Sequence, residues 1–329
     1  MGATVVFHGD CDGVIATYLY IKKFLRDLYP SHINLVVTHP WRAHVDLQKA
    51  QPGSELIVLD IALNDRISSA IASISTRHPK VVVVDHHATS EPFVGRIQNY
   101  ARVIYSKSTS TPRLLAQYFS MPLNPYESLL VDVADVCEGE APPSTDDRSA
   151  LEVVDSIRMS VAFNPGDVEF MRHLIDLMMK TKNIHQDEVV RTRARRAKLL
   201  LSGLLRVISE DSVDFGRLKL SFLSLLVSRA FAGLIGVAAT ELSKAYRKTV
   251  VLVREEQDKV VITVRSAERW ALELSKAISE SLGGVYGGHA EASSITLGKE
   301  PLEVVVGKLI KLIEPLITNL RAPKLGELK

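Results

Sequence analysis

Three polar motifs in this chain carry groups that bind metal ions or transfer protons, and each follows a run of apolar or β-branched residues. They are HGDCDG at residues 8–13, Asp60, and the triplet Asp85, His86 and His87. Asp10 and Asp12 stand two residues apart, so in an extended loop their carboxylates point the same way and suit a shared cation. Without a cation, two adjacent carboxylates repel each other. Helix capping by Asp12 is the alternative interpretation.

Five short apolar runs predict the strands that position these motifs: residues 4–7, 33–38, 56–59, 81–84 and 102–105. Residues 81–84 are four consecutive valines, which is typical of a central parallel strand buried on both faces. Helical patterns separate the runs, which predicts a doubly wound parallel sheet with right-handed crossovers. Such a sheet brings the carboxyl ends of its strands to one edge, where open α/β folds bind ligands. We therefore expect one site at this edge.

A second α/β unit is expected after residue 213. The patterns predict strands at 217–227, 249–253 and 260–265 and helices at 230–246, 270–282 and 301–320. Arg265 and Ser266 stand at a strand end, and an arginine can hold a phosphate through two parallel hydrogen bonds. GGVYGGH at residues 283–289 predicts a loop whose backbone amides approach an anion closely. We predict a catalytic domain at 1–182, a helical linker at 183–212 and a substrate-binding domain at 213–329.

Three features leave alternatives open. On the helix predicted at 126–136, either Asp132 or Asp135 could complete the acidic cluster. The loop at 39–44 contains Trp41 beside an arginine and two histidines, so it could stack a base and hold a phosphate, or be an ordinary surface loop. The basic run at 191–198 fits a solvated helix face better than a nucleic-acid contact.

Composition is that of an ordinary globular protein. The 329 residues are 46% hydrophobic and 24% charged, with a formal net charge of +2, so any polyanion must be bound by a local patch. Two cysteines exclude a disulfide scaffold and a cysteine-rich zinc site, and they fit a reducing cytoplasm. No apolar run is long enough to cross a bilayer, and we expect a cytoplasmic protein that has no signal peptide and does not bind membranes.

The order of motifs resembles the DHH phosphoesterases with a DHHA1 domain, a family that includes RecJ-like exonucleases and bacterial nanoRNase and pAp-phosphatase enzymes. The resemblance covers nearly the whole chain. Its motifs are, in order, HGDCDG, Asp60, Asp85-His86-His87, VADV at 133–136, and Gly287-Gly288-His289 preceded by Arg265-Ser266. This chain departs from the family pattern at Tyr286, which replaces a usual glycine, and at ASS in 292–294, which replaces the usual Ala-Ala-Gly.

The resemblance implies two divalent ions, usually Mn²⁺, with Mg²⁺ as the alternative. Asp60 would bridge the ions, His87 would lie beside the substrate, and Asp85 would support the other residues. The implied metal ligands are His8, Asp10, Asp12, Asp60, His86 and Asp135, the last preferred to Asp132 because Ala-Asp-Val resembles the RecJ form. Arg265, Ser266, Gly287, Gly288 and His289 would bind the substrate across an interdomain cleft. Carboxylate and imidazole ligands without thiolate favour manganese independently of the resemblance.

Three functions fit these residues. The first is a two-metal hydrolase of short single-stranded oligonucleotides, like a nanoRNase or exonuclease, or of pAp, since a two-domain chain has little room for modules that track long strands. The second is a phosphodiesterase for a cyclic dinucleotide or a phosphatase for another small molecule. The third is a catalytically silent relative of RecJ in replication, which the intact motifs disfavour. The residues fit RNA as well as DNA and either polarity of degradation, and they are compatible with a homodimer.

The two cysteines lie beside predicted ligands. Cys11 stands between Asp10 and Asp12, and Cys137 stands two residues after Asp135. We expect both to be free, buried thiols that fill space under the site. The alternative is that one thiol is captured by a soft metal such as zinc.

Overall fold

The computed structural model describes residues 2–139 and 148–320. The chain divides into two units, Met1–Lys198 and Leu199–Lys329, and each is described by itself. The division falls within helix α9 (Glu188–Glu210), inside the segment predicted as a helical linker. None of the helices in the described residues is long and apolar enough to cross a membrane.

The first unit is built on a five-stranded parallel sheet in the order β2-β1-β3-β4-β5, which confirms the predicted doubly wound topology. Its strands are β1 (Ala3–His8), β2 (Ile33–Thr38), β3 (Glu55–Leu59), β4 (Val81–Asp85) and β5 (Arg102–Tyr105). Every strand pair is parallel, so the carboxyl ends of all five strands lie at one edge. Strand β2 lies on one side of β1, and β3 and the later strands lie on the other. This change of side at β1 is the switch point where such folds bind ligands.

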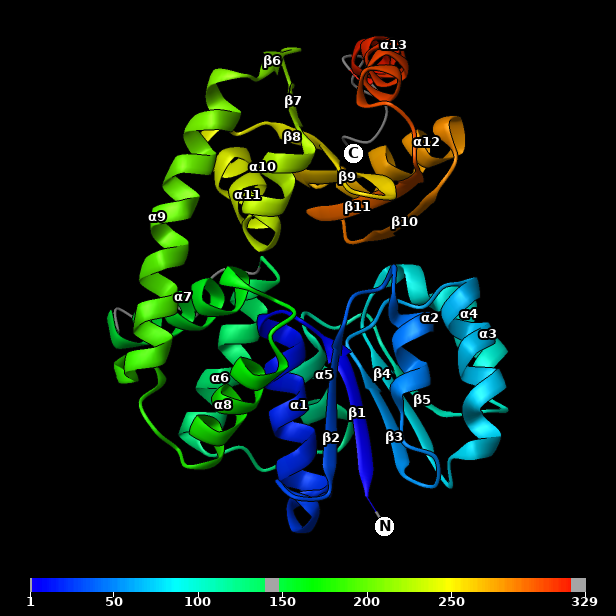
Figure 1. Ribbon diagram of the computed structural model, residues 1–329, viewed down its shortest axis with the longest axis vertical. Helices are drawn as coiled ribbons and strands as arrows, with labels where there is room; N and C mark the ends of the chain where they lie inside the picture. The colour runs from blue at the N-terminus through cyan, green and yellow to red at the C-terminus, as the bar shows by residue number, and fades with distance from the viewer. Residues whose placement is uncertain (1, 140–147, 321–329) are drawn as a thin grey trace, which may run out of the picture. The chain divides into compact units, whose positions relative to one another are not determined.

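Helices cover both faces of this sheet (Figure 1). Val82 and Val84 of β4 pack into one core and Val81 and Val83 into the other, as the period of two in a strand requires. On one face lie α1 (Cys11–Phe24), α5 (Thr111–Tyr118), α6 (Pro125–Cys137), α7 (Arg148–Phe163) and α8 (Val168–Met179). On the other lie α2 (Ala43–Asp46), α3 (Asp65–Ile74) and α4 (Glu91–Ile97). Single 3-10 turns occur at η1 (Arg26–Leu28), η2 (Leu47–Lys49), η3 (Ser75–Arg77), η4 (Ala88–Ser90) and η5 (Ile184–Gln186).

The second unit contains a mixed six-stranded sheet in the order β10-β11-β9-β8-β7-β6. Its strands are β6 (Val213–Asp214), β7 (Leu218–Leu223), β8 (Thr249–Glu255), β9 (Lys259–Ser266), β10 (Val285–Gly288) and β11 (Ala292–Gly298). Among these described strands, β7 and β8 alone pair in parallel. The helical elements are α10 (Leu225–Ala230), η6 (Ala232–Leu234), α11 (Ile235–Tyr246), α12 (Ala271–Leu282) and α13 (Leu302–Leu320). Apolar residues of α12 and α13 share one core with β8, β9 and β11.

Two predictions in this unit were wrong. The strand predicted at 217–227 ends at Leu223, because Ser224 begins a new helix that continues through Val227. The glycine-rich segment predicted as a loop is partly strand, since Tyr286 and Gly287 pair with β11. Gly288 has a φ of 131°, and a Cβ there would collide with the carbonyl of Ala292, so this strand end requires glycine.

Candidate metal centre and substrate-binding residues

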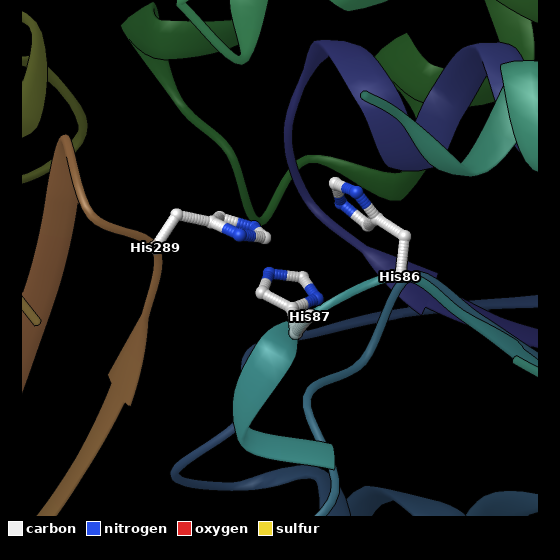
Figure 2. Close-up of side chains that lie close together, drawn as sticks. All are labelled: His86, His87 and His289. Atoms are coloured by element: carbon white, nitrogen blue, oxygen red, sulfur yellow. The ribbon is translucent and has the colours of Figure 1, made fainter. Parts of the chain in front are cut away.

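The predicted site of the first unit forms at the carboxyl edge of its sheet. His8 ends β1, Asp60 follows β3, and Asp85 ends β4. His86 and His87 come directly after Asp85, at the end of the valine strand (Figure 2). Asp60, Asp85 and His86 are each at most 2% exposed. Parallel strands thus bring together side chains that are up to 79 positions apart, from His8 to His87.

The HGDCDG motif turns the chain sharply from β1 into α1. Asp10 caps the helix, because its Oδ1 accepts a hydrogen bond from the backbone nitrogen of Gly13 at 2.9 Å. A Cβ on Gly13 would collide with the carbonyl of His8, so glycine permits the turn. Asp12, the alternative cap, is instead fully buried in the first turn of α1, and its Oδ2 accepts from the backbone nitrogen of Thr111 at 3.0 Å.

Asp60 is the central residue of the cluster. Its φ of 59° is a left-handed conformation that aspartate adopts more readily than most residues and that is concentrated at functional sites. Its Oδ1 accepts from the hydroxyl of Thr111 at 2.9 Å and lies 3.5 Å from Nε2 of His86. Its Oδ2 lies 3.7 Å from Nδ1 of His8, which is beyond hydrogen-bond distance. Asp60 therefore joins the first and third motifs.

Both histidines of the third motif are oriented by a second partner. Nδ1 of His86 lies 3.0 Å from the carbonyl of Ser108, which leaves Nε2 3.5 Å from both Oδ2 of Asp12 and Oδ1 of Asp60. Nδ1 of His87 lies 2.7 Å from Oδ1 of Asp85. Oδ2 of Asp85 accepts from the hydroxyl of Ser90. The acid that begins the motif thus holds the ring of His87, as expected of a supporting residue.

The charges in this cluster act strongly on one another. Burial lowers the pKa of His86, but the neighbouring Asp60 and Asp12 outweigh burial and raise it to about 11. Burial raises the pKa of Asp60, but the three histidines outweigh burial and hold it well below its ordinary value. Burial and the charge of Asp60 raise the pKa of Asp12. The site concentrates negative charge that only cations or protons can balance.

Asp135 lies outside this cluster, although it was predicted as a ligand. Its Oδ1 accepts from the hydroxyls of Thr109 and Ser110, and its Oδ2 accepts from Nε of Arg113 at 2.9 Å and from Nη2 at 2.5 Å. The alternative, Asp132, accepts from the same Nη2 at 2.7 Å. Both candidates for the fourth motif are therefore engaged by one arginine.

Glu138 is a site residue that the sequence analysis missed. It directly follows α6 and is half-buried, and its charge contributes to the raised pKa values of Asp12 and His86. Burial, together with the charges of Asp10 and Asp60, raises the pKa of Glu138 to about 7. The signal was its position, three residues after Asp135 and so on the same side of the helix end.

A serine- and threonine-rich segment after β5 was also missed. Ser108, Thr109, Ser110 and Thr111 contact three of the predicted acids and His86. Their signal was topological, because residues that follow β5 reach the same edge of the sheet as the other motifs.

The two cysteines form a disulfide, so the prediction of free thiols was wrong. Cys11 lies in the first turn of α1 and Cys137 at the end of α6, which places the bond between the first and fourth motifs. Proximity in the fold, which sequence separation does not reveal, brings the two sulfurs together. No thiolate is then available for a soft metal, and the zinc-capture alternative does not apply to the disulfide form.

In the second unit the predicted substrate residues differ in how they are engaged. Arg265 donates from Nε to the hydroxyl of Thr240 at 3.1 Å and from Nη1 to two backbone carbonyls, those of Val264 and Ser293. Ser266 is 4% exposed, and its hydroxyl lies 2.9 Å from that of Thr249. The hydroxyl of Ser266 therefore stabilises the sheet instead of facing outward.

His289 begins the turn between β10 and β11 (Figure 2). Its backbone nitrogen donates to the carbonyl of Ala292 at 2.7 Å. Gly287 and Gly288 precede it in β10, and Ala292 pairs with Arg265 across β11 and β9. The second unit thus places His289 and Arg265 near one end of the same sheet.

The donor set of the first unit fits divalent metal ions. His8, Asp10 and Asp60 offer ligand atoms within 4.8 Å of one another, and so do Asp12, Asp60 and His86. Asp60 belongs to both groups. Among the described residues, Oδ1 of Asp12 and Oδ2 of Asp60 are buried without a hydrogen bond, which is costly unless a cation binds there. All the atoms are carboxylate oxygens or imidazole nitrogens, the ligands that Mn²⁺ and Mg²⁺ accept.

Solved structures with a similar fold include three informative ones. The first is RecJ from Thermus thermophilus in complex with Mn²⁺, with a TM-score of 0.64 at 17% identity. The match covers 98% of this chain but 52% of RecJ, so the chain spans about half the length of that protein. The second is the DHH domain of a member of a ribosomal-protein family, with a TM-score of 0.65 at 13% identity and coverages of 95% and 86%.

The third is the pGpG-specific phosphodiesterase PggH from Vibrio cholerae, with a TM-score of 0.57 at 15% identity and coverages of 97% and 99%. At these identities the likeness shows a common fold alone. A search of curated protein sequences finds no match. The family model described as "DHH family, N-terminal domain" matches residues 3–137, and that described as "DHHA1 domain" matches residues 220–318. The chain therefore belongs to the DHH family of phosphoesterases, in the form that carries a DHHA1 domain.

Proposed function

We propose that this protein is a two-metal phosphoesterase that hydrolyses phosphodiester bonds in short single-stranded oligonucleotides. The observation that carries the proposal is the pair of overlapping ligand groups that share Asp60. A shared carboxylate is the arrangement that holds two ions close enough to act on one phosphate. Manganese is the proposed ion, since RecJ of the same fold has been solved with Mn²⁺ and also with Mg²⁺.

His8 and Asp10 would hold one ion, Asp12 and His86 the other, and Asp60 both. When bound, the ions supply a hydroxide nucleophile at neutral pH and neutralise charge on the phosphoryl oxygens. Asp135, which the family resemblance implies as a ligand, would first have to release Arg113. Glu138 is a further acid beside the cluster, and it could balance the charge of the ions in place of Asp135.

The chain's own residues have separate tasks in this reaction. Asp85 holds Nδ1 of His87, so the other ring nitrogen, Nε2, is the atom that can hold a proton toward a phosphoryl or leaving oxygen. Burial lowers the pKa of His87, but the charge of Asp85 and its hydrogen bond outweigh burial and raise it, which favours that proton at neutral pH. Arg265 would bind a substrate phosphate through its guanidinium.

Short substrates are proposed because a protein named for its action on pGpG, which is a dinucleotide, shares this fold along 97% of this chain and 99% of its own. The test is hydrolysis in Mn²⁺ of pAp, RNA and DNA di- to pentanucleotides, a long labelled strand, cyclic dinucleotides and pyrophosphate. We expect the highest kcat/KM on the di- to pentanucleotides. A preference for a cyclic dinucleotide or pAp would replace the proposed substrate, and hydrolysis of none of these compounds would refute the proposed activity.

A further inference from the structure

An aromatic stack leads from the metal cluster to the surface of the first unit. The ring of His39 lies edge-on to that of His8, with centroids 5.4 Å apart and an interplanar angle of 86°. The ring of Trp41 is nearly parallel to that of His39, with centroids 6.5 Å apart and an interplanar angle of 9°. Trp41 is 43% exposed. Part of the Trp41 side chain therefore faces solvent, two rings away from the proposed metal ligand His8.

The turn that carries these rings follows directly from strand β2. Strand β2 pairs with β1 so that Thr38 lies opposite His8, which places the turn at the same edge as the cluster. The carbonyl of His39 accepts from the backbone nitrogens of both Arg42 and Ala43 at 2.9 Å. The strand pairing and these hydrogen bonds hold the turn at this edge of the sheet.

The neighbouring arginine is engaged through one nitrogen. Nε of Arg42 donates to Oδ1 of Asp46 at 3.2 Å, and Oδ2 of Asp46 accepts from the hydroxyl of Thr38 at 2.7 Å. Asp46 is 2% exposed. Through this nitrogen Arg42 supports the turn.

We propose that Trp41, backed by His39, is a stacking platform for a nucleobase of the substrate, whose phosphate lies at the metal cluster. The inference rests on the proposed function and adds to it the residue that contacts a base of the substrate. Aromatic side chains bind unpaired bases through their π-faces. Every base has such a face, so the platform selects for a base and not for its identity.

The kinetic test compares a dinucleotide with an otherwise identical compound that lacks both bases. We expect Trp41→Ala to lower kcat/KM on the dinucleotide by roughly 5- to 150-fold, the equivalent of about 1–3 kcal/mol. The same substitution should change kcat/KM on the abasic compound by less than about twofold, and Trp41→Phe should restore most of the loss because it keeps an aromatic face. Equal losses on both compounds, or no loss on either, would overturn the proposal.

A binding test separates this inference from the proposed catalysis. The chain has two tryptophans, so Trp41 is the sole indole in a Trp270→Phe variant. We expect adenosine monophosphate to quench its fluorescence, and ribose 5-phosphate, which has the same phosphate without a base, to have no effect. Equal responses would overturn the platform. If the chain hydrolyses no phosphodiester yet adenosine monophosphate alone quenches the indole, the proposed activity fails while the platform stands.

Discussion

Two acidic regions of the first unit lie close in the fold but differ in how their charges are balanced. At the sheet edge, Asp12 and Asp60 are buried, and each has one oxygen without a hydrogen bond among the described residues. At α6, both oxygens of Asp135 accept hydrogen bonds, from two hydroxyls and from Arg113. A buried carboxylate oxygen without a hydrogen-bond donor is energetically costly unless a cation binds it. A carboxylate whose two oxygens both accept hydrogen bonds stabilises the fold. The difference separates candidate ligands from structural acids.

The largest expected effect comes from removing the acid shared by both ligand groups. We expect Asp60→Ala to lower kcat by more than the roughly 10- to 100-fold typical of residues that only support a metal ligand. The fold should persist, because the substitution removes buried negative charge. Steady-state kinetics in Mn²⁺ and circular dichroism measure the two effects. Asp65→Ala, at an exposed acid of α3, is the matched control, and activity of Asp60→Ala within about tenfold of the wild type would refute the assignment.

The disulfide links the two acidic regions covalently, and breaking it tests how much this link adds to the free energy of unfolding. It joins residues 126 positions apart, and removing a native disulfide typically lowers the free energy of unfolding by about 2–5 kcal/mol. We expect that loss for Cys11→Ser with Cys137→Ser, measured by denaturant unfolding. A thiol-reducing agent should reproduce it in the wild type and leave the double variant unchanged. Equal stability of the oxidised wild type and the variant would show that the bond does not stabilise the protein.

Asparagine substitutions at Asp135 and Asp12 test which acid binds metal and which stabilises the fold. We expect Asp135→Asn to weaken its contacts with Arg113 and lower the free energy of unfolding by about 1–3 kcal/mol, while changing Mn²⁺ affinity by less than about tenfold. Asp12→Asn should instead lower the Mn²⁺ affinity by more than about tenfold and change the free energy of unfolding little. Calorimetric titration with Mn²⁺ and denaturant unfolding measure both properties. Loss of one bound ion in Asp135→Asn, without loss of stability, would return Asp135 to the ligand set that the family resemblance implies.

The second unit offers a matched pair of adjacent residues. We expect Arg265→Ala to raise KM about tenfold with little change in kcat, because the guanidinium is proposed to bind phosphate and not metal. Ser266→Ala should leave KM unchanged, since its buried hydroxyl contacts Thr249 inside the sheet. Michaelis–Menten kinetics on a dinucleotide distinguish the two. An unchanged KM in Arg265→Ala together with weaker metal binding would show that the residue is misplaced.

The smallest effect concerns Asp167, an acid outside the two ligand groups whose oxygens each accept a hydrogen bond. Partial burial raises the pKa of Asp167, but hydrogen bonds from the backbone of Phe170 and from Arg193 outweigh it and lower the pKa. A lowered folded-state pKa adds stability that is present above the unfolded value of about 3.9 and is lost as pH falls through the folded one. We expect the free energy of unfolding, measured from about pH 6 to pH 2, to decrease once the pH is lower than about 4. The decrease should be less steep in Asp167→Asn than in the wild type. Parallel curves would contradict this.

Much of the first unit could be predicted from its sequence because the signals are local. Runs such as residues 81–84 define strands, helical patterns separate them, and a parallel sheet necessarily brings strand ends to one edge. His8, Asp60, Asp85 and His86 were therefore expected together, and the structure places them together. The second unit was harder, because β10 becomes a strand only by pairing with β11.

Only the tertiary structure determined the contact partners of residues that look equivalent in the sequence. Asp12 and Asp135 both lie within predicted motifs, yet of these two aspartates only Asp135 contacts Arg113 among the described contacts. Cys11 and Cys137 stand far apart in the chain, and the approach of α1 to α6 is what pairs them. Residue type and spacing determined which side chains reach the sheet edge. Whether a carboxylate accepts a hydrogen bond or a cysteine forms a disulfide depends on distances between segments, and no local sequence pattern encodes those distances.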